Sequence, residues 1–151
     1  MKAVVYTRYG PPDVLRLTDV ETPVPRGDEV LVKVHAVALN GSDWETLRGK
    51  PAYSRIGGPF RPRHHILGSD IAGRVAATGP EATLFRPGDD VFADILSSMG
   101  GFAEYARVPQ SALSQMSAGL TTRKRRPFPR REPSLCRASG TKDRSSPGRP
   151  C

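Results

Sequence analysis

A small, mainly β domain is the fold class that residues 1–120 predict. The apolar stretches in this part of the chain are short and rich in β-branched residues, and Gly or Pro interrupts each of them. Only one short segment carries the start and stop signals of a helix, so the alternation of strands and helices that marks a parallel sheet is missing. Six short strands and one short helix together indicate a β barrel or sandwich.

Six segments have the composition of strands, and turn residues separate them. In chain order they are Lys2–Thr7, Leu15–Val20, Glu29–Leu39, Ile71–Thr78, Asp90–Ile95 and Phe102–Val108. The third segment alternates most clearly, since its even-numbered positions from Val30 to Ala36 would share one face of a sheet. Lys33 and His35 would then lie on the opposite face, where His35 is expected to be structural.

One helix is predicted after the third strand. Ser42 and Glu45 have the spacing of a capping box, with Ser42 at the cap and Glu45 three residues later. The helix would run to about Arg48 and stop at the glycine and proline that follow. A loop rich in Pro, Gly and Arg then occupies residues 49–65.

The composition changes at about Thr121. Residues 1–120 carry 13 Lys and Arg and 13 Asp and Glu, so the whole formal net charge of +8 lies in residues 121–151. This second part has too few apolar residues to form a core, and we expect a disordered basic tail. Its charge by itself would favour a nucleic-acid partner. However, Phe128 is its only aromatic residue, and it contains no recognisable nucleic-acid module, so nucleic acid is not the partner we expect.

Other protein classes are disfavoured by simple features of the chain. It contains no apolar run of the ~18 residues that a membrane-spanning helix needs, and its first residues do not resemble a secretory signal. Both cysteines, Cys136 and Cys151, lie in the tail, so residues 1–120 can form neither a disulfide nor a thiolate metal site. We therefore expect a cytoplasmic protein without a membrane partner.

Four segments carry a family resemblance in their order and spacing. They read MKAVVYTRYGPPDVL, PVPRGDEVLVKVHAVALNGSDW, LGSDIAGRVAATGPEATLFRPGDDVF and GGFAEYARVP. Together they resemble the N-terminal, GroES-like catalytic domain of the medium-chain dehydrogenase/reductase superfamily, and most closely its zinc-independent, quinone-oxidoreductase-like group. The resemblance covers residues 1 to about 120 and implies a partly open β barrel.

The resemblance also bears on metal binding. Zinc-dependent members of the superfamily hold the metal with a Cys in C-G-[TS]-D and a His-Glu pair in G-H-E, but the matching positions here are Asn40, Ser69 and Asp70. An amide, a hydroxyl and one carboxylate are not the thiolate and imidazole ligands that zinc prefers. The family's structural zinc loop lacks its cysteines as well, so we expect no zinc. His64 and His65 are adjacent and would point to opposite faces of an extended segment, so we expect them to be loop residues.

The resemblance implies hydride transfer from NADPH to a quinone, an enone or a related small carbonyl compound, with this domain forming one wall of the cleft. The matching positions make Asn40 and Asp43 candidate catalytic residues. Asn40, Ser69 and Tyr53 are candidates for cofactor contacts. Without zinc, hydrogen-bond donors must polarise the substrate oxygen, and the Asn40 amide can supply one. The alternatives are that Asp43 only caps the helix or holds Asn40, that Tyr53 is an exposed loop aromatic, and that Ser69 belongs to a turn. Family members are often homo-oligomers.

The family's cofactor domain is expected to be absent. Such a domain needs a βαβ unit with a glycine-rich phosphate turn, and none follows residue 120. We therefore expect a fragment that is inactive alone. Our hypothesis for residues 121–151 is out-of-frame translation, because suitable codons let the neighbouring frame encode the helix and connection that the family has here.

Two other interpretations of the tail stay open. It could be a natural basic arm or a solvated extension without a role. The alternative function is accordingly a stand-alone β-barrel binding module whose arm binds nucleic acid or an acidic surface.

Overall fold

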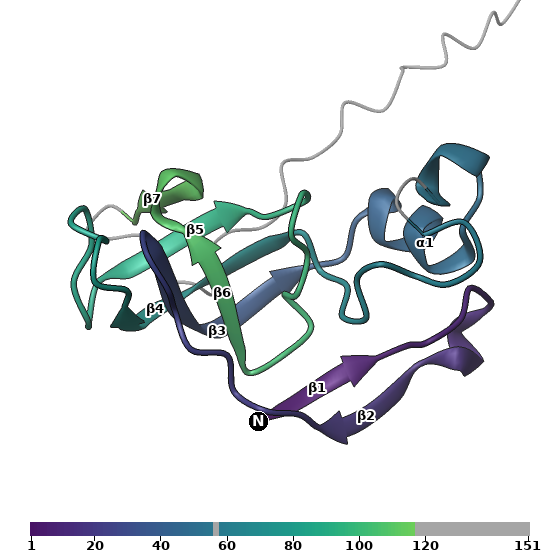
Figure 1. The fold of residues 1–151 in the computed structure, drawn as a ribbon, viewed down its shortest axis with the longest axis horizontal. Coiled ribbons are helices and arrows are strands. Elements are labelled where there is room, and N and C mark those ends of the chain that lie inside the picture. Colours follow the sequence, from purple (N-terminus) through teal and green to yellow (C-terminus); the bar gives the residue numbers. More distant parts are fainter. Residues whose placement is uncertain (56–57, 117–151) are drawn as a thin grey trace, which may run out of the picture.

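The computed structural model describes residues 1–55 and 58–116. Within these residues the chain forms two antiparallel sheets and one α-helix (Figure 1). The strands are β1 (Lys2–Val5), β2 (Arg16–Asp19), β3 (Glu29–Ala38), β4 (Asp70–Thr78), β5 (Asp90–Asp94), β6 (Tyr105–Pro109) and β7 (Leu113–Gln115). The helix is α1 (Gly41–Arg48), and short 3-10 turns occupy Pro12–Val14, Ala52–Arg55 and Gln110–Ala112.

The larger sheet is open at both edges. Its strand order is β6-β3-β4-β5-β7, and every neighbouring pair is antiparallel. Strands β1 and β2 form a separate hairpin, which Figure 1 shows beside the larger sheet and below β6. Single bridges from Ala3 to Ala103 and from Val5 to Ile66 connect the hairpin to the rest of the domain. These features confirm the prediction of a mainly β, partly open barrel with one short helix.

The main core lies on one face of the five-stranded sheet. It consists of buried residues contributed by all five strands together with Ile95: Val30, Val32, Ile71, Val75, Val91, Ala93, Ile95, Ala106, Val108 and Leu113. The predicted alternation in β3 holds in part, because Val30 and Val32 are fully buried whereas Lys33 and His35 are exposed. Leu31 is buried too, and the β3–β4 register shifts between Leu31 and Val32, so a bulge breaks the strict alternation there.

A second cluster fixes the helix to the hairpin. Tyr6 follows β1, Leu47 belongs to α1 and Leu67 precedes β4, and all three side chains are buried against one another. Burial of such apolar surface contributes roughly 25 cal/mol per Å², so these contacts stabilise the position of α1 relative to the start of β4. The candidate site lies at that junction.

The helix begins earlier than predicted. Asn40, not Ser42, is the N-cap: its backbone is extended, with φ −111° and ψ 163°, and the Asp43 carboxylate accepts the Asn40 N–H bond at 2.8 Å. The predicted Ser42–Glu45 box was wrong because Asn-x-x-Asp has the same spacing and caps as well as Ser-x-x-Glu. The predicted stop is confirmed, since Gly49 ends the helix in the left-handed conformation at φ 60°.

Most strand predictions are correct to within one or two residues, and two differences are larger. The sixth predicted strand, Phe102–Val108, begins at Tyr105 because Phe102 and Glu104 bond to residues before β4 and to the hairpin. Strand β7 was not predicted. It has only three residues, and only Leu113 among them is apolar, so it carries little sequence signal.

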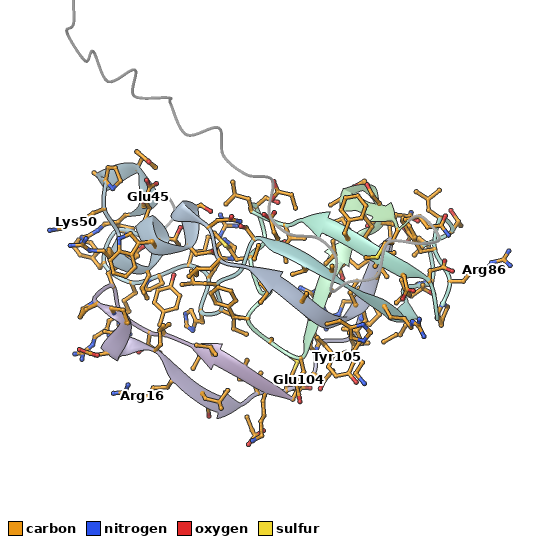
Figure 2. All side chains as sticks on the ribbon, turned by 180° about the vertical axis from the view of Figure 1, so that it is seen from behind. Arg16, Glu45, Lys50, Arg86, Glu104 and Tyr105 are labelled. Atoms are coloured by element: carbon orange, nitrogen blue, oxygen red, sulfur yellow. The ribbon has the colours of Figure 1, made fainter. Side chains whose placement is uncertain are left out.

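The helix α1 and the loop that contains Arg86 lie at opposite ends of the domain. Glu45 and Lys50 lie at the end that contains α1, whereas Arg86 projects from the other end (Figure 2).

In the part of the chain that the structure describes, no helix is long and apolar enough to cross a bilayer. The prediction of a disordered basic tail concerns residues 121–151, which lie outside the described residues.

Candidate functional site

The site forms where the start of α1 meets the start of β4. Asn40 immediately precedes the helix. About 30 residues later in the chain, Asp70 begins β4 and Ser69 immediately precedes it. The Asn40 side-chain nitrogen donates to Ser69 Oγ at 3.1 Å and to Asp70 Oδ2 at 2.8 Å. The structure thus brings together three of the residues that the sequence analysis matched to metal positions.

Asp43 connects the two sides of this junction through hydrogen bonds. Its side chain is 1% exposed, and its two oxygens accept backbone N–H bonds from Asn40 at 2.8 Å and from Gly68 at 3.0 Å. A carboxylate in the first turn of a helix also interacts favourably with the helix dipole. Asp43 therefore ties the helix to the segment before β4 and is positioned to orient Asn40.

Gly68 and Gly101 allow the two segments to approach closely. Gly68 has φ +97°, and a Cβ at that position would lie 2.8 Å from Gly101 Cα and from Phe102 N. The Gly101 N–H donates to the Gly68 carbonyl at 3.0 Å. Only a glycine at position 68 therefore allows the segment that carries Ser69 to pack this closely against residues 101–102.

An open cavity of about 430 Å³ lies over the junction. Its lining comes from the helix start, the start of β4 and the end of β5: Asn40, Gly41, Ser42, Glu45, Ser69, Asp70, Asp94 and Leu96. Three of these residues carry carboxylates and none is basic. The cavity is therefore acidic, and Coulomb repulsion disfavours a negatively charged occupant.

Tyr53 does not line the cavity, but it bonds to Glu45, which does. The residue is 59% exposed, and its hydroxyl donates to Glu45 Oε2 at 2.7 Å. This hydrogen bond to the carboxylate raises the pKa of Tyr53. The predicted cofactor contact of Tyr53 would therefore have to compete with Glu45.

The histidines lie away from the cavity lining. His35 is exposed on β3, and His64 and His65 belong to the loop before β4. Burial and the neighbouring Arg63 lower the pKa of His64. Among residues 1–55 and 58–116, no three His, Cys, Asp or Glu side chains gather in a way that could hold a metal ion.

The contribution of β5 to the site was not predicted from the sequence. Asp94 and Leu96 line the cavity, and Asp94 pairs with Asp70 across the β4–β5 ladder. Only the strand pairing brings these residues to the site, so no local motif could have identified them. Asp70 was noted solely as the replacement of a zinc ligand, although its bond to Asn40 fixes the orientation of that amide.

Comparison with known proteins agrees with this architecture. The family model for the alcohol dehydrogenase GroES-like domain matches residues 26–118. A quinone oxidoreductase of Homo sapiens is 42% identical over 107 residues, which make up 70% of this chain and 30% of that protein.

Solved structures show the same fold. The quinone oxidoreductase of Coxiella burnetii matches with a TM-score of 0.70 and 30% identity, over 80% of this chain and 38% of the other. A mycobacterial protein complexed with NADPH matches with a TM-score of 0.65 and 29% identity, over 80% and 35% of the two chains. The chain spans about a third of the length of the curated relatives it matches. The chain belongs to the alcohol dehydrogenase GroES-like domain family, in the medium-chain dehydrogenase/reductase superfamily, and its relatives there include quinone oxidoreductases.

Proposed function

We propose that residues 1–116 form the substrate-side wall of an NAD(P)H-dependent oxidoreductase that reduces quinones, enones or related carbonyl compounds. The observation that carries this proposal is the cavity around Asn40, Ser69 and Asp70, in a domain whose relatives include quinone oxidoreductases. The mycobacterial relative's complex with NADPH supports NADPH as the hydride donor. Because the cavity lining is acidic and has no cation, the proposal extends to neutral substrates in preference to anionic ones.

The reaction that we propose does not use zinc. The candidate ligands are an amide, a hydroxyl and a carboxylate, and the amide nitrogen and one carboxylate oxygen already bond to each other. Zinc in proteins prefers thiolate or imidazole ligands in a tetrahedral set. Asn40, Ser69 and Asp70 therefore do not fit the metal, and hydrogen-bond donors are left to stabilise charge on the substrate oxygen.

The roles of the individual residues follow from their bonds. Asn40 and Ser69 lie on the cavity wall, where a nicotinamide ring or a substrate could contact them. Asp43 positions Asn40 through the backbone, and Tyr53 bonds to Glu45 of the cavity lining. The chemistry that the cofactor supplies when bound is the hydride, and this domain supplies the shape and polarity of the facing wall.

A second domain is needed for cofactor binding in this proposal. All the sheet pairs among the described residues are antiparallel, so the domain offers no βαβ unit there for a dinucleotide. We accordingly propose that residues 1–120 are the catalytic domain, that they do not turn over substrate alone, and that residues 121–151 arise from a displaced reading frame.

A chimera tests this function. Residues 1–116 would be joined to the cofactor domain of a relative such as the Homo sapiens quinone oxidoreductase. The chimera should oxidise NADPH when 2-cyclohexenone or a neutral quinone is added, whereas the present chain should not. A folded chimera that binds NADPH but oxidises it with none of these acceptors would contradict the proposal.

A further inference from the structure

Asn40 has no hydrogen left to give to a substrate. A side-chain amide carries two N–H bonds, and in this site one is donated to Ser69 Oγ and the other to Asp70 Oδ2. Rotating the amide by half a turn would place its oxygen against the Asp70 carboxylate, which repels it. Asp70 therefore fixes the amide with its nitrogen turned inward, and another group must polarise a bound carbonyl.

Ser69 has the hydrogen that Asn40 lacks. Its oxygen accepts the bond from Asn40, so its own O–H is directed elsewhere, and no described residue accepts it. Ser69 lines the cavity and is itself only 2% exposed, so little solvent reaches this residue although the cavity is open. A hydroxyl that already accepts a hydrogen bond is also the stronger donor.

The other polar groups of the lining are less suited to this task. The Leu96 N–H donates to Asp94 at 2.9 Å, and the hydroxyl of the neighbouring Tyr53 donates to Glu45. Ser42 lines the cavity too, but it is partly exposed, and no bond to a described residue fixes its hydroxyl. Solvent therefore competes for Ser42, whereas the orientation of Ser69 is preorganised.

We propose that Ser69 is the catalytic hydrogen-bond donor to the substrate carbonyl oxygen, and that Asp70 is a positioning residue that acts through Asn40. This inference rests on the proposed function, and it moves to Ser69 the task that the sequence analysis gave to Asn40. It concerns one hydrogen bond, which strengthens as negative charge develops on the oxygen during reduction. No proton leaves Ser69 in this step.

Binding of an unreactive ketone to the present chain tests the assignment without any cofactor. Cyclohexanone would be titrated into the ¹⁵N-labelled protein, with methylenecyclohexane as the matched probe that lacks the oxygen. The expected result is a set of amide shifts at Ser69 and Asp70 with cyclohexanone, and an affinity about tenfold lower in Ser69→Ala, as the loss of one hydrogen bond predicts. Ser114→Ala, at an exposed serine outside the cavity lining, should lose less than about twofold. Asp70→Asn should weaken cyclohexanone binding but not methylenecyclohexane binding.

An infrared measurement on the unmodified protein covers the case in which Ser69→Ala does not fold. The carbonyl stretch of bound ¹³C-labelled cyclohexanone should move to lower wavenumber than in an apolar solvent. Equal affinity of the wild type and Ser69→Ala, or an unshifted stretch, would overturn the Ser69 assignment alone. The absence of any shift at the cavity with either probe would count against both this assignment and the proposed function.

Discussion

At the scale of single residues, the site is organised by carboxylates that hold other groups in place. Asp43 accepts two backbone N–H bonds, and Asp70 accepts one amide hydrogen, so both act on Asn40 from different sides. Asn40 is consequently fixed in its backbone and in its side chain. The Ser69 hydroxyl accepts a bond from Asn40, and no described residue accepts its hydrogen.

Replacing Asp43 should destabilise the domain. In Asp43→Asn, the amide has one acceptor oxygen for two N–H donors, so one buried donor loses its partner, and we expect a loss of about 2 kcal/mol in the free energy of unfolding. Urea unfolding measures this loss. Asp19→Asn is the matched control, since Asp19 is exposed and should change stability by less than about 0.5 kcal/mol. Equal stabilities of the two variants would contradict the role given to Asp43.

Tyr6 should make the stability of the domain fall at high pH. Burial, with a smaller contribution from Tyr9, raises the pKa of Tyr6 to about 12. The unfolded chain loses this proton near pH 10, so between pH 10 and 12 it binds fewer protons than the folded chain, and stability falls by up to about 1.4 kcal/mol per pH unit. Below pH 10 the contribution is fully present.

Tyr6→Phe is the variant that checks this assignment. The Tyr6 hydroxyl is buried and has no hydrogen-bond partner among the described residues, so its removal should raise stability at pH 7 by about 1 kcal/mol. It should also reduce the loss between pH 10 and 12, as measured by urea unfolding at several pH values. Parallel pH profiles for the two proteins would show that Tyr6 does not titrate as described.

At the scale of the elements, the site depends on how strands β3, β4 and β5 pair. Gly73 in β4 faces the Lys33 carbonyl on β3, and a Cβ there would collide with that carbonyl. On the other side of β4, the pairing of Asp70 with Asp94 brings a second carboxylate to the cavity. Like charges that face each other across a ladder repel, so this pair costs stability and is explained better by the site than by the fold.

Gly73→Ala should separate β3 from β4. Because backbone atoms block the new methyl group, we expect a loss of about 2 kcal/mol or more in the free energy of unfolding. Gly41→Ala is the control, since nothing lies within 4 Å of its would-be Cβ, and it should change stability by less than about 1 kcal/mol. Chemical denaturation measures the free energy of unfolding of both variants. A Gly73→Ala variant as stable as the wild type would mean that β3 and β4 lie farther apart than the structure shows.

The acidic lining should discriminate between ligands by charge. At low salt, 4-oxocyclohexanecarboxylate should bind at least about threefold more weakly than cyclohexanone, because its carboxylate meets Asp70 and Asp94. Asp94→Asn should reduce this difference, and salt should reduce it as well, since the cavity is open to solvent. NMR titration measures both affinities. A difference that persists unchanged in Asp94→Asn would show that Asp94 does not act on the ligand.

The sequence predicted the elements better than the site. Strand composition and the glycine stop of the helix depend on local backbone preferences, and these were read correctly from the Val-rich segment at Glu29 and from Gly49. The motifs also predicted that Asn40, Ser69 and Asp70 belong to one site, and the structure places them together. Strand β7 was missed because it has only three residues. The helix cap was misassigned because two capping patterns with the same spacing lie side by side. The role of Asp94 was missed because it depends on strand pairing, which leaves no local signal in the sequence.

At the scale of the whole molecule, the charge of the chain and the site belong to different parts of it. Residues 1–120 balance their charges, and the excess of +8 lies in residues 121–151. The family model ends at residue 118, close to this change of composition. The reading-frame proposal explains the coincidence without giving the basic residues a function.

The nucleotide sequence around codon 121 tests that proposal. The frame displaced by one nucleotide should encode a helix and the approach to a dinucleotide-binding strand, and an open frame should continue downstream. Stop codons or unrelated residues in that frame would contradict it. A titration with DNA at two salt concentrations tests the binding-module alternative, which requires tight binding that weakens steeply with salt.

The central claim is that the Asn40, Ser69 and Asp70 cavity supports carbonyl reduction without a metal. The most direct test is the rate of NADPH oxidation by the chimera described above, with 2-cyclohexenone as the acceptor, before and after exhaustive dialysis against a chelator. We predict an unchanged rate and less than one tenth of a zinc ion per chain, as a site without thiolate or imidazole ligands implies. A rate that disappears on dialysis and returns when zinc is added would contradict the claim.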